Sequence, residues 1–350
     1  MRKRTALFVI TLLATSQLIG VSLSRANGQD EVDIEGRLPR PLYRASAVWD
    51  GHEALVFGGR NETQVFDDVI AYDVSHNVAS YESVLPSKMS SAPSIWDGSH
   101  ALIFGGIDDI GVKLDRIIRY DSHGGTAEVM NAELPNGRVG SSAVWDGDHA
   151  FIFGGHDTEF LSEIVRYDTS TDTITVMSSE LPIGIAGTSA IWDGSYVYIF
   201  GGRDNVSALD HILRYDPSTD TIEKLGETLP GPRFHASAVW DGESAYIFGG
   251  RNMEKTLDEI VRFTPSTLNV TLLSVRLPSP RELTCAVWDG ETAHIFGGMS
   301  AFVAMDDVVG FEPGDGGPAG IWESPILYVL LAVVIVSLAT VVAWLARERG

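Results

Sequence analysis

Arginine recurs at two fixed positions of this chain, and the pattern predicts an anion-binding surface. Arginine directly follows a Gly-Gly pair three times, and three times it lies seven residues before a tryptophan. A histidine two residues after one of these arginines adds another donor. Guanidinium groups make bidentate contacts with carboxylates, sulfates and phosphates. The predicted binding residues are Arg60, Arg138, Arg203, Arg233, His235, Arg251 and Arg281.

The same arginines have a structural alternative. Most repeats place an aspartate where we expect the third strand to begin, and an arginine that pairs with it would not bind a partner. These aspartates are Asp67, Asp115, Asp210, Asp258 and Asp306. The sequence leaves both interpretations open.

The other reactive side chains do not indicate a catalytic centre. His156 follows a Gly-Gly pair, Glu282 is the only carboxylate expected close to an inner strand, and no histidine pair has metal-ligand spacing. Cys285 is the single cysteine and occupies a position where most repeats have serine, which favours a packing role. We therefore expect no catalytic residue, metal or cofactor. The alternative is a carbohydrate-active enzyme, modifying sugars or sialic acids in a central channel.

These residues belong to a repeat that organises most of the chain. Trp-Asp-Gly, an apolar run and Phe-Gly-Gly occur six times, with tryptophans 47, 49, 47, 48 and 48 residues apart. Such a period is typical of repeat architectures. The tryptophans are Trp49, Trp96, Trp145, Trp192, Trp240 and Trp288.

Each repeat predicts four short strands. In the fifth repeat, a first strand covers 236–240, and the following Asp-Gly predicts a type I′ hairpin turn. The unbroken apolar run 245–248 predicts a second strand buried on both faces, and 260–263 a third. The fourth strand of the preceding repeat covers 221–225. Six such units predict an all-β, six-bladed β-propeller over residues 29–313.

The glycine pairs, the spaced tryptophans and a Tyr-Asp after the third strand resemble kelch repeats. The Tyr-Asp pairs begin at Tyr72, Tyr120, Tyr167 and Tyr215. Two features depart from the kelch pattern: the tryptophan precedes Asp-Gly, and Phe263 and Phe311 replace the tyrosine. The resemblance covers about four-fifths of the chain and implies a kelch-type propeller. Some kelch propellers bind acidic peptides, with arginines at matching loop positions.

The sixth repeat lacks its own fourth strand, because it stops after its third strand at 308–311. Residues 31–36 precede Leu38-Pro39 just as 221–225 precede Leu229-Pro230. We therefore expect the N-terminal segment 31–36 to form the outer strand of blade six and to cover a bare sheet edge.

The ends of the chain predict a membrane-anchored protein. Residues 1–28 have a basic start, an apolar stretch and small residues before a cleavage point, which is typical of a signal peptide. A linker at 314–324 precedes an apolar span at 325–346, long enough to cross a bilayer, and arginines in the tail 347–350 predict a cytoplasmic end. The predicted location is the cell membrane, single-pass, with the propeller extracytoplasmic. A retained signal anchor is the alternative at the N-terminus.

Strand alternation sorts the loops onto two faces. The Asp-Gly and Tyr-Asp loops share one face, from which the chain leaves toward the linker, so we expect this acidic face toward the membrane. The arginine-bearing loops would face outward. Three acceptor sequons, at Asn61, Asn205 and Asn269, predict possible glycosylation.

A net charge of −22 argues against general nucleic-acid binding, which needs a basic surface. The sequence therefore predicts a monomeric, non-catalytic cell-surface binding or adhesion propeller whose arginine face captures an anionic protein or glycan. The alternatives to a binding propeller are the carbohydrate-active enzyme described above and an architectural surface-coat protein.

Overall fold

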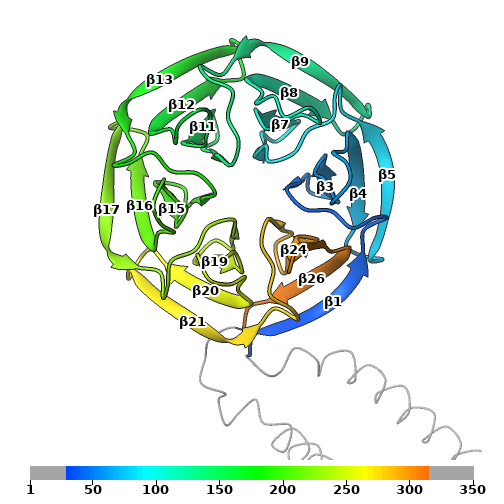
Figure 1. The fold of residues 1–350 in the computed structure, drawn as a ribbon, viewed down its shortest axis with the longest axis vertical. Helices are drawn as coiled ribbons and strands as arrows, with labels where there is room; N and C mark the ends of the chain where they lie inside the picture. Colours follow the sequence, from blue (N-terminus) through cyan, green and yellow to red (C-terminus); the bar gives the residue numbers. More distant parts are fainter. Residues whose placement is uncertain (1–28, 315–350) are drawn as a thin grey trace, which may run out of the picture. The chain divides into compact units, whose positions relative to one another are not determined.

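The computed structural model describes residues 29–314, and these residues form a ring of six four-stranded antiparallel sheets (Figure 1). No helix occurs among them, and none within residues 29–314 could therefore span a membrane. The predicted signal peptide, linker, transmembrane helix and tail all lie outside the described residues, except that the linker begins at Gly314. The six-bladed all-β prediction is confirmed.

Blades one to five each run from an inner to an outer strand in chain order. Blade one contains β2 (Ser46–Trp49), β3 (Ala54–Phe57), β4 (Asp68–Asp73) and β5 (Val78–Val84). Blade two contains β6 (Ser94–Trp96), β7 (Ala101–Phe104), β8 (Arg116–Asp121) and β9 (Thr126–Glu133). Blade three contains β10 (Ser142–Trp145), β11 (His149–Phe153), β12 (Glu163–Asp168) and β13 (Thr173–Glu180).

The remaining blades follow the same plan, with one addition. Blade four contains β14 (Ser189–Trp192), β15 (Val197–Phe200), β16 (His211–Asp216) and β17 (Thr221–Thr228). Blade five contains β18 (Ser237–Trp240), β19 (Ala245–Phe248), β20 (Glu259–Thr264) and β21 (Asn269–Arg276). Blade six contains β22 (Cys285–Trp288), β23 (Ala293–Phe296), β26 (Asp307–Glu312) and β1 (Glu31–Arg37), and carries a hairpin of β24 (Met299–Ser300) and β25 (Val303–Ala304).

The turn between the first two strands differs from the prediction. Trp240 pairs with Ala245, so four residues form the loop, whereas a type I′ turn has two. The carboxylate of Asp241 accepts hydrogen bonds from the backbone N–H groups of Glu243 and Ser244, and only Gly242 has positive φ. The aspartate therefore folds the loop through its side chain.

The Phe-Gly-Gly motif joins each blade to the next. The phenylalanine of one blade packs against the buried third-strand aromatic of the following blade, as in Phe57 with Tyr120 at 5.5 Å between ring centroids. Each second glycine donates its N–H at 2.8–2.9 Å to a carbonyl of the segment entering the next blade. A side chain at the first glycine would collide with or crowd against that carbonyl, as at Gly249 with Arg281. The last contact, Gly298 to Leu42, closes the ring.

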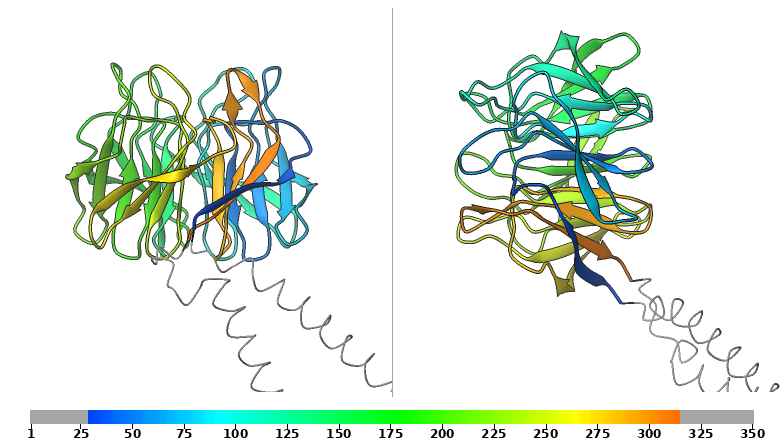
Figure 2. Two further views of the ribbon diagram at one scale, coloured as in Figure 1. Left: turned by 90° about the horizontal axis from the view of Figure 1, so that it is seen from below. Right: turned by 90° about the vertical axis from the view of Figure 1, so that its right-hand side faces the viewer.

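The N-terminal strand closes blade six as predicted, since β1 pairs with β26 as the outer strand. Its bounds extend one residue beyond the predicted 31–36. A salt bridge of 2.5 Å joins Arg37 to Asp306, and the Leu38 N–H donates to the carbonyl of Asp306. Both ends of the propeller lie on the face opposite the β24–β25 hairpin (Figure 2).

A buried histidine forms an ion pair with this closing strand. His294 on β23 lies 2.7 Å from the Glu35 carboxylate and 2.8 Å from that of Asp289. Glu35 reaches it across Gly310, where a side chain would collide with the carboxylate. Burial opposes protonation, but the two carboxylates outweigh it and raise the pKa of His294 to about 9.

The propeller should therefore lose stability in mild alkali. Because the pKa of His294 is raised from 6.5 to about 9 on folding, its contribution is fully present below pH 6.5 and is lost as pH rises through 9. The shift corresponds to about 3 kcal/mol. We expect urea unfolding at pH 6 and pH 10 to show this loss, and His294→Leu, which copies Leu55 and Leu102 of blades one and two, to remove most of the difference. An equal loss in the variant would contradict the assignment.

Candidate functional site: the mouth of the central channel

Three of the seven predicted binding residues are buried structural groups. The side chains of Arg138, Arg233 and Arg281 are 0%, 1% and 0% exposed. They form salt bridges of 2.7–2.9 Å with Glu163, Glu259 and Asp307. Each also donates to the carbonyl of the first glycine of its own blade, at 3.2–3.3 Å. Placing these three arginines on the binding surface was wrong, because each side chain turns inward beneath the glycine pair.

The structural alternative, in which these arginines pair with acidic residues at the third strands, was correct, but the acidic partners lie one residue later in the repeat than the predicted aspartates. The partners are the first residues of the third strands of their blades. The predicted Asp258 and Asp306 directly precede two of these partners, and Ser162 precedes the third, Glu163. Those preceding residues use their backbone instead: each carbonyl accepts the N–H of a buried leucine that starts the next Leu-Pro, as Asp258 does for Leu277. Within residues 29–314, only Asp306 of that series pairs with an arginine, and its partner is Arg37.

The other three blades support a structural role for this position. Leu42, Met89 and Ile185 lie seven residues before their tryptophans and are buried. The third strands of these blades start with Asp68, Arg116 and His211, and Asp68 is paired with Arg40 instead. The position therefore takes either an arginine with an acidic partner or an apolar side chain.

A ring of backbone hydrogen bonds surrounds the channel axis. One residue per blade, five before the tryptophan, donates its N–H to the carbonyl of the equivalent residue in a neighbouring blade at 2.7–3.2 Å. All six residues have φ between 58° and 70°, a left-handed conformation that favours glycine. They are Arg44, Ser91, Gly140, Gly187, His235 and Leu283. Holding Arg44, Ser91, His235 and Leu283 in this conformation costs energy, which makes the ring a candidate site.

The other four predicted binding residues lie around this ring. Arg60, Arg203 and Arg251 each pair through the backbone with the residue six before a tryptophan, in the segment that leads to the ring. Arg60 lies over Tyr43, Arg203 over Phe160 and Phe234, and Arg251 over Phe234, at 5.5–6.0 Å from guanidinium carbon to ring centroid. Stacking on aromatic faces orients guanidinium groups while leaving their edges free to bind.

We call the opening formed by the six-residue ring and by Arg60, Arg203 and Arg251 the channel mouth. Glu282 makes this mouth asymmetric. Its carboxylate is 4% exposed and lies 3.3 Å from both Arg251 and His235, with the Thr256 hydroxyl at 3.4 Å. Other blades have Tyr43, Ser90, Val139, Ala186 and Phe234 at this position. A carboxylate with these partners holds Arg251 and His235 in place and is not a free acid.

The cations at the mouth outnumber the carboxylates. Within residues 29–314, Arg44, Arg60 and Arg203 form no salt bridge with a carboxylate. Burial lowers the pKa of His235, and the nearby Arg44 and Arg203 lower it further against the opposing effect of Glu282. Burial and then Lys113 likewise lower the pKa of His156, whose ring lies 3.3 Å from the lysine amine. Like charges are therefore held close together here, which favours an added anion.

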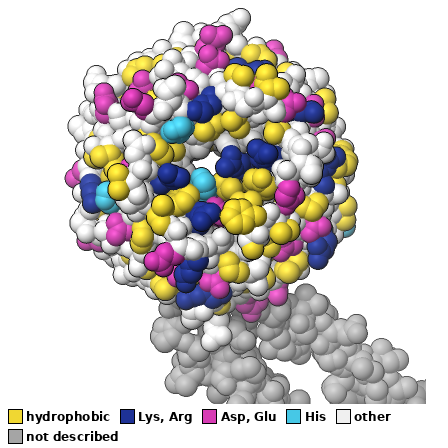
Figure 3. All heavy atoms as spheres, viewed as in Figure 1, with side chains coloured by type: hydrophobic (Ala, Val, Ile, Leu, Met, Phe, Trp, Pro, Cys, Tyr) yellow, Lys and Arg dark blue, Asp and Glu magenta, His cyan; other side chains and the backbone are white. Residues whose placement is uncertain are grey.

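The mouth opens into a cavity of about 480 Å³ on the β24–β25 face. Its polar lining includes Arg44, Arg203, Arg251, His235 and Glu282. Its apolar lining includes Tyr43, Phe234, Met253, Met299 and Phe302. Figure 3 shows basic, histidine and hydrophobic side chains around the central opening, whereas most acidic side chains lie toward the rim.

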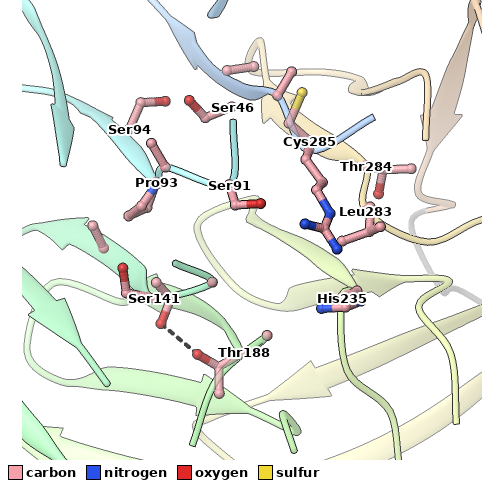
Figure 4. Close-up of a pocket in the computed structure, with 18 of the residues that line it drawn as sticks. Ser46, Ser91, Pro93, Ser94, Ser141, Thr188, His235, Leu283, Thr284 and Cys285 are labelled. Carbon is pink, nitrogen blue, oxygen red and sulfur yellow. Dashed lines mark hydrogen bonds between the residues drawn. The ribbon is translucent and has the colours of Figure 1, made fainter. Parts of the chain in front are cut away.

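The channel has a second cavity of about 200 Å³, which is lined mostly by small residues. Hydroxyl groups of Ser46, Ser94, Ser141 and Thr188 line it (Figure 4). Cys285 takes its place among them, and burial raises the pKa of its thiol to about 12. A protonated thiol is a poor nucleophile, consistent with the packing role predicted for this cysteine.

The sequons occupy different parts of the ring. Asn61 and Asn205 lie in loops between second and third strands, beside Arg60 and Arg203, whereas Asn269 begins β21 on the outer wall. The Asn61 carboxamide oxygen already accepts hydrogen bonds from the backbone of Thr63 and Gln64. Glycosylation of the three sites stays a prediction.

Sequence reasoning missed Arg44, Lys113 and the aromatic residues Tyr43, Phe160 and Phe234. The signal for Arg44 was available, because two other repeats place glycine five residues before the tryptophan, at Gly140 and Gly187. Glycine in an otherwise substituted position indicates a left-handed backbone. The aromatic residues gave no such signal, since smaller side chains replace them in other blades.

The ring of six four-stranded blades around a central channel defines the chain as a β-propeller. A family model described as the KLHDC2/KLHL20/DRC7 Kelch-repeats domain matches residues 15–179 and 173–316. The chain therefore belongs to the kelch-repeat family. Kelch propellers suggest a protein-binding scaffold, and kelch propeller families are generally non-catalytic. No curated protein matches the chain.

Proposed function

We propose that this chain is a non-catalytic binding propeller that captures an anionic partner at the channel mouth. The observation that carries the proposal is the group of arginines without carboxylate partners, Arg44, Arg60 and Arg203, set among aromatic rings. They stand out in a chain whose net charge is −22. Electrostatic attraction to such a site speeds encounter and gives specificity.

The partner we propose is an acidic protein segment, with an anionic glycan as the other outcome of the test. The proposal includes the location expected from the sequence: an anchor at 325–346 and an extracytoplasmic propeller whose channel mouth faces away from the membrane. The ends of the propeller, on the face opposite the mouth, support this orientation (Figure 2). The pairing of Glu282 with Arg251 and His235 supports the binding role, because it holds these two side chains in position at the mouth.

Binding of a fluorescein-labelled deca-glutamate peptide to the full-length chain tests this function. The triple variant Arg44→Gly, Arg60→Met, Arg203→Met takes its residues from equivalent positions in other blades, Gly140 and Met299. None of the three arginines has an ion pair to lose within residues 29–314, so the fold should be preserved. We expect Kd to rise at least about 10-fold, since each lost charge contact is worth about 1 kcal/mol.

A control variant removes the same charge from elsewhere. Arg119, Arg214 and Arg276 lie in the outer parts of their blades, and the first two pair with exposed glutamates. Their replacement by alanine should leave peptide affinity within about 2-fold. Equal weakening in the two triple variants would show that only net charge matters and would refute the site. A heparin oligosaccharide that binds in place of the peptide, with the same variant dependence, would identify a glycan partner.

A further inference from the structure

We propose that the 480 Å³ cavity at the mouth takes a tyrosine that carries a sulfate or phosphate ester, presented by a protein partner. This inference rests on the proposed function and narrows it from any acidic segment to one side-chain chemistry. The cavity combines a cationic side with an aromatic and thioether side, and an aryl ester matches both. The two esters share this chemistry, and the experiment below separates them.

The cationic side fits a compact anionic head group better than a lone carboxylate. Arg44, Arg203 and Arg251 all line the cavity, against the single carboxylate of Glu282. Glu282 is engaged by Arg251 and His235, and neither Arg44 nor Arg203 forms a salt bridge within residues 29–314. The three terminal oxygens of a sulfate or phosphate ester can accept from several guanidinium groups at once.

The apolar side fits an aromatic ring. Phe234 lies beneath Arg203 and Arg251, while Met253, Met299 and Phe302 complete the wall. Thioethers and aromatic edges pack favourably on an arene, and guanidinium groups favour aromatic faces. An aspartate or glutamate side chain would satisfy the cations and leave this wall exposed to water.

The β24–β25 hairpin of blade six contributes Phe302 to this apolar side of the cavity. Phe302 is 77% exposed, and it follows Ala301 in a two-residue turn in which both residues have positive φ, 47° and 66°. Such turns favour Asn-Gly, so a bulky phenylalanine here is strained as well as solvent-exposed. An exposed and strained aromatic residue at the edge of a cationic cavity is explained if it covers the ring of a bound ligand.

Peptides that differ at one position test the inference on the full-length chain. One sequence is prepared with sulfotyrosine, phosphotyrosine, glutamate, tyrosine or phenylalanine at that position, and affinities are measured by isothermal titration calorimetry. We expect at least one tyrosine ester to bind about 10-fold or more tightly than glutamate, and unmodified tyrosine and phenylalanine to bind more weakly still. The ester that binds better identifies the modification.

Phe302→Gly separates loss of binding from loss of folding. Glycine relieves the positive φ, so the melting temperature should stay the same or rise, while affinity for the preferred ester should fall about 10-fold towards that of the glutamate peptide. Val206→Gly is the matched control, because Val206 is an equally exposed loop-tip residue, 83% exposed, that does not line the cavity. Affinity in this control should not change.

The inference is overturned if glutamate binds as tightly as both esters, or if ester affinity is unchanged in Phe302→Gly. If glutamate and ester peptides bind equally and both depend on Arg203, the proposed function survives without this specificity. If no anionic peptide binds at all, the proposed function fails together with the inference.

Discussion

Deletion of residues 31–36 is expected to destabilise the entire ring, by about 5 kcal/mol or more. The deletion exposes the edge of β26, removes the ladder of backbone hydrogen bonds between β1 and β26, and leaves His294 without Glu35. Each net hydrogen bond is worth about 1 kcal/mol, and a buried charge without its partner costs more. Circular dichroism during heating should show one transition, shifted down by more than about 10 °C.

The matched control is Asp33→Ala in the same strand, which removes an exposed side chain and keeps the backbone ladder. Its unfolding should differ from the parent by less than about 0.5 kcal/mol. If the deletion instead gave two transitions, with five blades melting at the parent temperature, closure of blade six would be a local feature and the account of the ring would be wrong.

The second large effect is expected at a buried ion pair. Glu259→Ala leaves the guanidinium of Arg233 1% exposed without a carboxylate, which should cost about 3–5 kcal/mol. Arg233→Met should cost about 1 kcal/mol or less, because blade two has Met89 at the equivalent position. The double variant should resemble Arg233→Met, since neither contains the buried guanidinium, and the carboxylate that Arg233→Met leaves is 25% exposed and can be solvated. Urea unfolding of the full-length chain measures all three.

An exposed ion pair provides the comparison. Glu223 pairs with Arg214, and both side chains are partly exposed, so Glu223→Ala should cost less than about 1 kcal/mol. Similar costs for Glu259→Ala and Glu223→Ala would show that Arg233 is not a buried structural group. Peptide binding should be unchanged in Arg233→Met, in contrast to the sequence-based placement of this residue in the binding surface.

The fold could be predicted from the sequence because each repeat reports the same constraints independently. Six Phe-Gly-Gly motifs mark the positions where blades contact through a glycine N–H, and the unbroken apolar runs mark strands buried on both faces, as in β19. The closing strand was predictable because its spacing to Leu38-Pro39 repeats that of the other outer strands. These are local patterns, and they need no knowledge of where a side chain points.

The site was harder to predict because side-chain direction decides it. Arg203 and Arg233 occupy loops on the same face, yet Arg203 reaches the mouth and Arg233 turns into the blade toward Glu259. Comparison of the six repeats indicates part of this difference, since the position of Arg233 holds the apolar residues Leu42, Met89 and Ile185 in three other blades. The contribution of Arg44 depends on hydrogen bonds among six separate blades, which no single repeat reveals.

The most direct test of the central claim compares two charge reversals that give the protein the same total charge. Arg203→Glu places a carboxylate at the channel mouth, and Arg119→Glu places one in the outer part of blade two. The account predicts that Arg203→Glu abolishes detectable binding of the deca-glutamate peptide by the full-length chain, whereas Arg119→Glu changes Kd by less than about 3-fold. Equal losses, or a larger loss for Arg119→Glu, would contradict it.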